Sequence, residues 1–381
     1  MASSFSNLVL ARYGEIALKG QNRPRFIRQL SSNVAGCLRH AGIAAAVARV
    51  ERRIYVETDT PEAAAQVLTR VFGLTSVSPA VRVPVDIEII KSVALQESQR
   101  AGLSAACTFR VQARRADKSF PLTSPEINRE VGAYIRENTG ARVNLSDDAD
   151  VTVGIEVQRD HALIYARVIP GPGGMPVPLG GRVVTLISAG LDSPVAAWMM
   201  IKRGCAIIPL HLAQSDESER RFRALCQVLQ GWSHGWHIKP VVMSHQEVFG
   251  AVCERLREVR GERWTCLFCK RTMVRTAEAV AHKHKADGVV LGDSLGQVAS
   301  QTLENMRIIS SGCELPIFRP LIGLDKVEIM ALARRIGTYD ISAQAAAPCP
   351  FLPERPVTVG KYERFRSLLS AVEGNAGDGK L

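Results

Sequence analysis

Hydrophobic positions in residues 1–60 follow two short strands and one helix. Apolar side chains run through residues 8–11 and 53–58, and those from Phe26 to Leu38 recur at helical spacing. The pattern predicts a helix over roughly 23–40 between the two strands. Residues 1–60 are therefore expected to form a small α+β domain.

Residues 61–170 show a second mixture of helical and strand patterns. Pro61 can open a first helix, and Pro125 and Gly140 can start and end another over 125–138. We expect a second α+β domain here. Alternating apolar positions predict its strands near 75–83, 107–113, 150–157 and 162–169.

The pattern changes after residues 171–181, the stretch richest in proline and glycine. Short apolar runs now alternate with longer helical patterns. Strands that are buried on both faces are apolar throughout, so the alternation predicts a doubly wound parallel sheet over residues 171–381. The predicted strands are 183–187, 206–210, 240–243, 288–291 and 316–318.

The distribution of charge indicates a class of binding partner. The net charge is +11, and nine basic residues stand between Arg12 and Arg53 against two acidic ones. A second basic cluster consists of Arg110, Arg114, Arg115 and Lys118. These clusters favour a nucleic acid as partner, although two solvated basic faces would give the same pattern.

Membrane and secreted classes are disfavoured. No apolar run reaches the length of a membrane span, and nine scattered cysteines indicate reduced thiols rather than a disulfide scaffold. We expect a cytoplasmic protein with no membrane partner.

The strand 183–187 leads into the small residues Ser188 to Ser193 and then into a helical pattern. A strand, a short loop and a helix N-terminus present free N–H groups to an anion, so this loop should hold a phosphate; an ordinary β–α turn is the alternative. Ser193 can cap the helix, and Pro194 suits its first position.

Three cysteines stand apart from the others. Cys266 and Cys269 form a Cys-x-x-Cys pair, and Cys349 lies in a proline-rich segment. The pair suits a metal centre, but it also fits a redox dithiol or a zinc site, to which His282 or His284 could add a ligand.

With these motifs the sequence resembles the PP-loop ATP pyrophosphatases, whose signature is Ser-Gly-Gly-x-Asp-Ser, and among them the tRNA 4-thiouridine synthetases of the ThiI family. Motifs at 12–23, 117–132, 292–305 and 319–326 carry the resemblance over almost the whole chain. It implies an N-terminal ferredoxin-like domain (1–60), a THUMP RNA-binding domain (61–170) and a PP-loop domain (171–381). Ala189 departs from the signature, which has glycine there.

The resemblance implies an enzyme that adenylates a tRNA uridine with ATP, expected at position 8, and replaces O4 by sulfur to give 4-thiouridine. Asp192 would engage Mg²⁺ or orient the loop, Cys349 would be the second catalytic residue, and Arg110, Arg114, Arg115 and Lys118 would contribute to RNA binding. Asp293 fits a helix N-cap as well as a catalytic role. The implied nucleotide site consists of Leu186, Ile187, Ser188, Gly190, Asp192, Ser193, His211, Leu212, Lys270, Arg271, Gly292 and Gln301.

Resemblance to an iron–sulfur subset of the family implies a 4Fe–4S cluster on Cys266, Cys269 and Cys349, with zinc as the alternative. Three cysteines leave one iron of such a cluster able to bind exogenous sulfide. The sequence stops at Leu381 without the C-terminal rhodanese domain of some members, so we expect sulfide or a persulfide carrier as sulfur donor. The resemblance also makes a homodimer plausible.

Two other functions stay open. A non-catalytic tRNA-binding protein with a degenerate PP-loop is one, and Ala189 is its best support. A PP-loop sulfurtransferase that acts on another base, or in thiamine thiazole synthesis, is the other. Asp192, Ser193 and the three cysteines favour an active enzyme.

Overall fold

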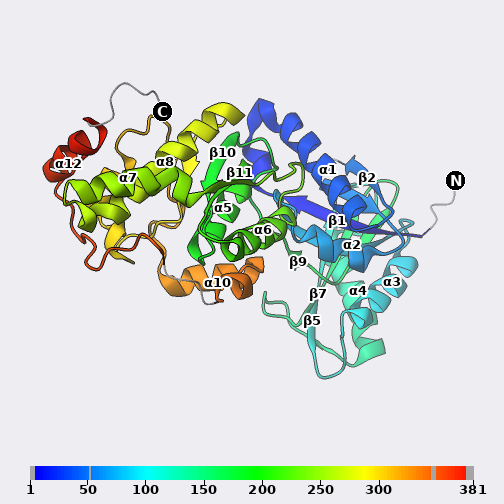
Figure 1. Ribbon diagram of the computed structural model, residues 1–381. Coiled ribbons are helices and arrows are strands. Elements are labelled where there is room, and N and C mark those ends of the chain that lie inside the picture. Colours follow the sequence, from blue (N-terminus) through cyan, green and yellow to red (C-terminus); the bar gives the residue numbers. More distant parts are fainter. Residues whose placement is uncertain (1–4, 51–52, 345–348, 375–381) are drawn as a thin grey trace. The chain divides into compact units, whose positions relative to one another are not determined.

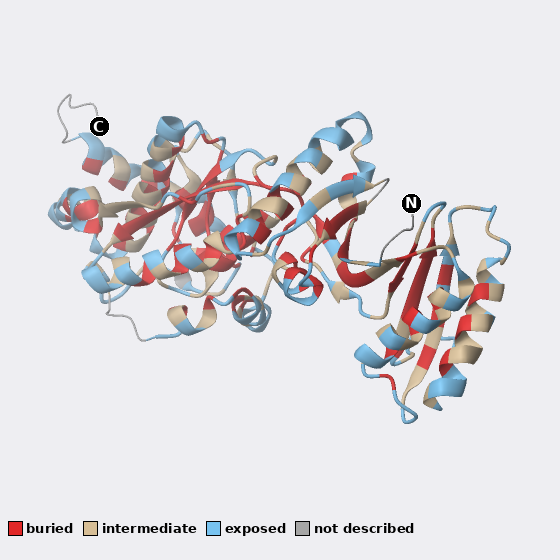
Figure 2. Cartoon of the chain, turned by 90° about the vertical axis from the view of Figure 1, so that its right-hand side faces the viewer, coloured by how far each residue is buried: buried red, intermediate tan, exposed pale blue. Residues whose placement is uncertain are grey.

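The computed structural model describes residues 5–50, 53–344 and 349–374 (Figure 1). The chain folds as two compact units, Met1–Pro176 and Val177–Leu381. Each unit is built around its own sheet, and buried residues follow the strands and the inward faces of the helices (Figure 2). Within the described residues, no helix is long and apolar enough to cross a bilayer.

The N-terminal unit contains one mixed sheet in the order β2-β3-β1-β4-β8-β7-β5-β6, and β9 pairs with β4. The predicted helices and strands are confirmed, except that the strand predicted over 162–169 is divided into β8 and β9, and β2, α3 and β6 are additions. Helix α4 ends at Gly140, which has the left-handed conformation that favours glycine. The elements are β1 (Ser6–Tyr13), α1 (Arg23–His40), β2 (Ala46–Val50), β3 (Arg53–Glu57), α2 (Pro61–Leu68), β4 (Leu74–Val83), α3 (Ile87–Arg100), β5 (Thr108–Arg115), α4 (Ser124–Thr139), β6 (Arg142–Val143), β7 (Val151–Val157), β8 (Ala162–Tyr165) and β9 (Ile169–Pro170).

The two faces of this sheet differ because side chains alternate along each strand. One face packs against helices α1 to α4 through residues such as Val9, Val56 and Val153. The opposite face, which we call the open face, carries a small apolar cluster around Leu10 and Tyr55. It also carries a row of arginines: Arg12, Arg53, Arg82, Arg110 and Arg114.

The open face is strongly curved. Arg53 on β3 forms an ion pair with Glu156 on β7, although β1, β4 and β8 lie between these strands. In a flat sheet four strand spacings would separate them by about 19 Å, more than the two side chains can span. The sheet therefore curls so that the open face is concave.

The C-terminal unit has the predicted parallel sheet, in the order β12-β11-β10-β13-β14. All five predicted strands are confirmed. The elements are β10 (Arg182–Leu186), α5 (Asp192–Lys202), β11 (Ala206–Ala213), α6 (Asp216–Gln230), β12 (Val241–Ser244), α7 (His245–Glu258), α8 (Thr265–His284), β13 (Val289–Val290), α9 (Leu303–Ser310), β14 (Ile317–Phe318), α10 (Lys326–Ile336), α11 (Tyr339–Ser342) and α12 (Tyr362–Gly374).

The strand order reverses at the centre of this sheet. From β10 the chain proceeds outward to β11 and β12 on one side, and later to β13 and β14 on the other. Helices α7, α8 and α12 cover one face through a core that includes Phe249, Phe268 and Phe365. In open parallel sheets, ligands bind at the carboxyl ends of the strands where the order reverses, which here is beside β10.

Candidate functional site

A loop of small residues lies at this reversal point. β10 ends at Leu186 and α5 begins at Asp192. Ser193 Oγ accepts a hydrogen bond from Ser188 N at 2.9 Å and lies 3.1 Å from Ser188 Oγ. The prediction that Ser193 caps the helix is wrong, because Ser193 lies inside the first turn and its side chain closes the loop. Gly190 N also donates to Ser188 Oγ, at 3.3 Å, so Ser188 and Ser193 together fix the loop's shape.

Ala189 does not strain this loop. In the described part of the chain, the non-glycine residues with positive φ are Arg260 and Lys285. Ala189 thus has a backbone conformation that any L-residue can adopt. Its presence in place of glycine gives no sign of a decayed phosphate loop.

Gly292, which follows β13, lies against the first turn of α5. A Cβ at this position would meet Ser193 Cα at 2.7 Å and Ser193 N at 2.8 Å, both closer than atoms can approach. Glycine is therefore required for the backbone after β13 to touch the phosphate loop. The structure brings the predicted residues Gly292 and Ser193 together.

Asp192 is paired with a lysine to which sequence reasoning assigned no role. Lys326 Nζ, at the start of α10, lies 2.7 Å from Asp192 Oδ1, and Gln297 Nε2 lies 3.4 Å from Oδ2. Both members of the ion pair stay partly exposed, at 42% for the lysine and 24% for the aspartate side chain. Lys326 was visible only as part of a family motif, since nothing local indicates its partner.

Asp293 is a second carboxylate of the site and is buried. Its Oδ1 lies 3.4 Å from both Lys270 Nζ and Gln301 Nε2, and its Oδ2 lies 3.1 Å from Arg319 Nε. The N-cap alternative for Asp293 is wrong, because its carboxylate instead contacts Lys270, Arg319 and Gln301. Such cations beside a phosphate loop can neutralise phosphate charge.

The carboxyl ends of β10 and β11 supply an apolar wall. His211 Nδ1 donates to the Ile187 carbonyl at 2.8 Å, and its ring stacks on Phe222 with centroids 4.9 Å apart. Burial lowers the pKa of His211, which keeps the ring neutral near pH 7. Leu186 and Leu212 are buried beside it. An apolar surface of this kind can border an adenosine.

Arg271 is not brought to the loop, although Lys270 is. Its Nε donates to the Ser311 carbonyl at 3.1 Å, and its Nη1 lies 3.3 Å from Glu373 Oε1. Side chains of successive helical residues point about 100° apart. Lys270 therefore faces Asp293, whereas Arg271 contacts Glu373 of α12. In this structure Arg271 stabilises the fold rather than lining the predicted nucleotide site.

The three cysteines of the predicted metal site lie near one another. Cys266 and Cys269 are the second and fifth residues of α8. Burial raises the pKa of Cys269 to about 12, and the neighbouring Cys349 and Cys266 add to the rise. Burial and Cys349 also raise the pKa of Cys266. Over the residues described, no group of three or more His, Cys, Asp or Glu side chains is placed to hold a single metal ion.

The histidines proposed as a further zinc ligand are wrong. His282 and His284 lie in the last turn of α8, so the helical rise puts His282 about 20 Å from Cys269. His245, at the start of α7, lies instead with its Nε2 3.1 Å from Cys269 Sγ. A single histidine in a helical pattern gave no sequence signal for this contact.

The second basic cluster is divided by strand alternation. Arg110 and Arg114 are on the open face, where Arg110 Nε donates to Thr152 Oγ1 at 3.0 Å. Arg115 is on the other side and donates to the carbonyls of Phe120 and Leu122 at 2.8 and 3.1 Å. Lys118 is exposed in the loop that Arg115 holds. Arg114 and Lys118 are thus the more accessible members of the four.

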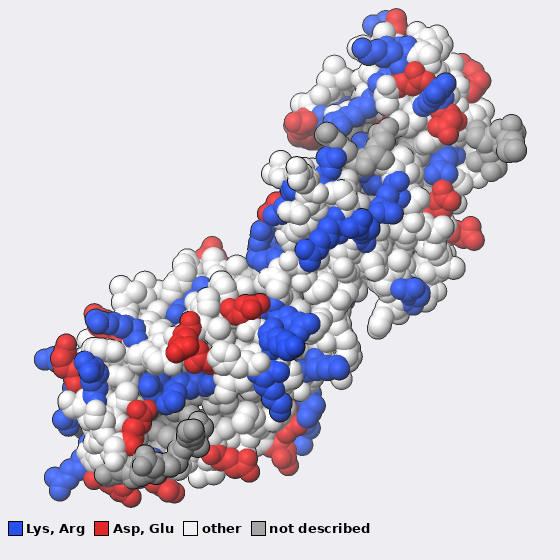
Figure 3. All heavy atoms as spheres, turned by 90° about the horizontal axis from the view of Figure 1, so that it is seen from above, with Lys and Arg blue, Asp and Glu red and all other residues white. Residues whose placement is uncertain are grey.

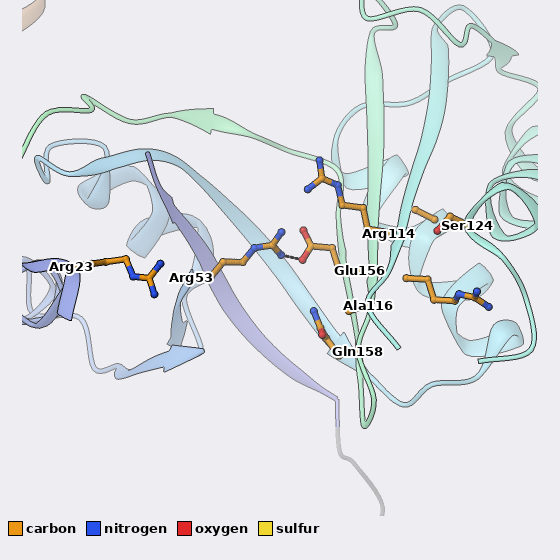
Figure 4. A pocket seen from close by; sticks show the side chains of 9 residues that line it. Arg23, Arg53, Arg114, Ala116, Ser124, Glu156 and Gln158 are labelled. Atoms are coloured by element: carbon orange, nitrogen blue, oxygen red, sulfur yellow. Dashed lines mark ion pairs between the residues drawn. The ribbon is translucent and has the colours of Figure 1, made fainter. Parts of the chain in front are cut away.

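A basic cavity of about 870 Å³ lies where the open face meets the first residues of helices α1 and α4 (Figure 4). Arg53 on β3 and Arg114 on β5 line it from different strands, and Arg23 lines it from the start of α1. Glu156 pairs with Arg53 at its centre. Lysine and arginine side chains gather in patches on the face drawn in Figure 3. A concave surface with more cations than anions suits a polyanion.

Comparison with protein families gives three matches in chain order. Residues 8–78 match the ThiI ferredoxin-like domain, residues 84–167 match the THUMP domain, and residues 179–373 match the family described as thiamine biosynthesis protein (ThiI).

Full-length relatives agree with these matches. A probable tRNA sulfurtransferase of Thermococcus kodakarensis is 41% identical over 97% of both chains. One of Methanocaldococcus jannaschii is 39% identical over 96% of this chain and 97% of its own. The crystal structure of a 4-thiouridine synthetase–RNA complex with bound ATP superposes with a TM-score of 0.86 at 32% identity, over 96% of this chain and 95% of that one.

Proposed function

The chain belongs to the ThiI family, and we propose from this premise that it is a tRNA sulfurtransferase that converts a uridine, at position 8, to 4-thiouridine. Uridine O4 attacks the α-phosphorus of ATP, pyrophosphate leaves, and sulfur then replaces the adenylated oxygen at C4 as AMP departs. The relatives are named as tRNA sulfurtransferases, and the superposed structure holds RNA and ATP. The division into domains 1–60, 61–170 and 171–381 is part of the proposal.

The loop and its neighbours support the adenylation step. The backbone N–H groups from Ser188 to Ser193 would hold the pyrophosphate, while Lys270 and Lys326 would offset its charge. Asp192 fits Mg²⁺, because its carboxylate is partly exposed and carboxylates hold this ion beside phosphates. The walls formed by Leu186, Ile187, His211 and Leu212, together with Gly292 and Gln301, would border the nucleotide.

Cys266, Cys269 and Cys349 would hold a 4Fe–4S cluster. Their residue types fit, since three neighbouring thiols suit such a cluster. The bound cluster supplies an iron that can carry sulfur from sulfide or a persulfide donor. The protein's part is to keep the three sulfur atoms beside the adenylated base.

One observation carries the proposal. Strand β11 carries His211, which contacts the Ile187 carbonyl, and three residues further along the chain Gln214 Nε2 lies 3.6 Å from Cys349 Sγ. Three residues of extended chain span about 10 Å. The adenylation loop and the cysteines are therefore close enough for one uridine to be activated and thiolated in the same unit.

The open face and the loop after β5, which carries Lys118, support tRNA binding. We expect Arg114→Ala with Lys118→Ala, made in the full chain, to weaken binding of transcribed tRNA and to lower the slope of log Kd against log salt by about 1 to 2. Arg220→Ala is the control, because Arg220 is an exposed arginine of the C-terminal unit paired with Glu217. An unchanged slope would place the RNA surface elsewhere.

Nucleoside analysis of tRNA tests the activity itself. A deletion strain should lack 4-thiouridine by mass spectrometry, and the wild-type gene should restore it whereas Asp192→Ala should not. Persistence of 4-thiouridine in the deletion strain would refute the proposal. A cytoplasmic location, where tRNA is found, and a homodimer complete the proposal; the dimer rests on family resemblance alone.

A further inference from the structure

Two side chains without a role in the proposed chemistry connect two of the cysteines. His245 Nε2 lies 3.1 Å from Cys269 Sγ, and His245 Nδ1 lies 3.2 Å from Gln214 Nε2. The same amide nitrogen lies 3.6 Å from Cys349 Sγ. A continuous path of polar contacts thus runs from Cys269 through His245 and Gln214 to Cys349.

The chemistry of these groups fixes the direction of each hydrogen bond. An amide nitrogen can only donate, so Gln214 donates to His245 Nδ1 and to Cys349 Sγ. With Nδ1 as acceptor, the proton of the neutral ring is on Nε2, which therefore donates to Cys269 Sγ. Both sulfur atoms receive a hydrogen bond.

Packing holds the histidine in this orientation. The His245 ring is 3% exposed and lies nearly parallel to Phe249, with centroids 5.9 Å apart. Phe351 meets the ring edge-on at 4.9 Å and also contacts Phe249. Because Phe351 is two residues after Cys349, the same contact docks the segment that carries this cysteine.

We propose that His245 and Gln214 are positioning residues, which hold the sulfur atoms of Cys269 and Cys349 by N–H···S hydrogen bonds while sulfur is transferred. A partly buried sulfur that carries negative charge is stabilised by such donors, because water reaches it only in part. The inference rests on the proposed function, because it assigns these residues to the thiolation step rather than to adenylation.

The hydrogen bonds can be observed in cluster-free protein. In protein with ¹⁵N-labelled histidines, the His245 ring should show the Nε2–H tautomer, and Gln214→Leu or Cys269→Ala should each shift its resonances. His245→Phe identifies the signal. Gln227→Leu, at an exposed glutamine of α6, is the control and should shift nothing. An Nδ1–H tautomer in wild-type protein would overturn the proposal.

Variant enzymes separate positioning from packing. His245→Phe keeps an aromatic ring between Phe249 and Phe351 but removes both nitrogens. We expect about tenfold slower 4-thiouridine formation, with a smaller change in pyrophosphate release, and partial rescue in His245→Gln, whose amide can donate near the Nε2 position. Equal thiolation by wild type and His245→Phe would overturn the proposal. Gln214→Leu, at an exposed position, repeats the test should the His245 variant fail to fold.

The reconstituted protein gives a third readout. Removing an N–H···S hydrogen bond should shift the reduction potential of the bound cluster to a more negative value, followed by EPR in a redox titration. An unchanged potential in both variants would count against hydrogen bonds to the ligating sulfur atoms. If wild-type protein makes no 4-thiouridine, the proposed function fails, while the tautomer still decides whether the hydrogen bonds exist.

Discussion

The phosphate loop and the cysteine group belong to the same unit but are prepared in opposite ways. At the loop, each carboxylate already faces a cation: Asp192 faces Lys326, and Asp293 faces Lys270 and Arg319. At the cysteines, burial holds the pKa of Cys266 and Cys269 above the ordinary thiol range. The loop thus already holds cations that an anion could contact, whereas the thiols would lose their protons only when a metal centre replaces them.

The strongest test of the loop side is Asp192→Ala. We expect tRNA-dependent pyrophosphate release to fall about 10³-fold, because the carboxylate would hold Mg²⁺ and orient Lys326. Asp287→Ala is the control, at an exposed aspartate after α8. Near-normal release by Asp192→Ala would mean that the loop is not the adenylation site.

The cysteine side is tested by Cys269→Ala and Cys349→Ala. Each should lower 4-thiouridine formation about 10²-fold and leave pyrophosphate release largely intact, because in the proposed reaction the cysteines would act after adenylation. Cys226→Ala is the matched control, since Cys226 is buried in α6 away from the three. Parallel loss of both activities would show that the two regions do not act separately.

The raised pKa of Cys269 predicts slow alkylation in metal-free protein. A shift from 9.0 to about 12 leaves about 10³-fold less thiolate at pH 8, and the greater nucleophilicity of a more basic thiolate offsets part of this. We expect iodoacetamide to modify Cys269 about 50-fold more slowly in folded than in denatured protein, measured by peptide mass spectrometry. Equal rates would show that the thiol is already ionised.

The same shift has a consequence for stability at high pH. A thiol with a raised pKa favours the folded state while it is protonated, so its contribution is complete below the unfolded pKa of 9.0 and is lost as pH rises toward about 12. Chemical denaturation of metal-free protein should therefore show a larger loss of stability from pH 9 to 11 in wild type than in Cys269→Ala. An equal loss of stability in wild type and Cys269→Ala would contradict the raised pKa of Cys269.

The smallest expected effect is that of Lys326→Ala. Lys326 is partly exposed and has one partner in Asp192, so we expect kcat/KM for ATP to fall about tenfold with the fold preserved. Lys283→Ala, in the exposed last turn of α8, is the control. No change in Lys326→Ala would assign the ion pair to the structure alone.

The sequence by itself determined the succession of most strands and helices, the parallel sheet, and the residues at the loop and the cysteines that are candidates for phosphate and metal binding. These features are local. A strand followed by small residues and a helix can be recognised from neighbouring residues in the sequence, without knowledge of any distant contact. The Cys-x-x-Cys spacing likewise places both thiols in one helical turn. Family motifs extended this reading to the tRNA substrate.

Only the tertiary structure decided which side chains meet. Lys270 and Arg271 are equivalent in the sequence, yet helical rotation turns one to Asp293 and the other to Glu373. His282 shares a helix with Cys269 but lies at its far end, while His245 reaches the same sulfur from another helix. The members of such pairs are far apart in the sequence. The distance between their side chains is set by the packing of the sheet and its helices, not by their spacing along the chain.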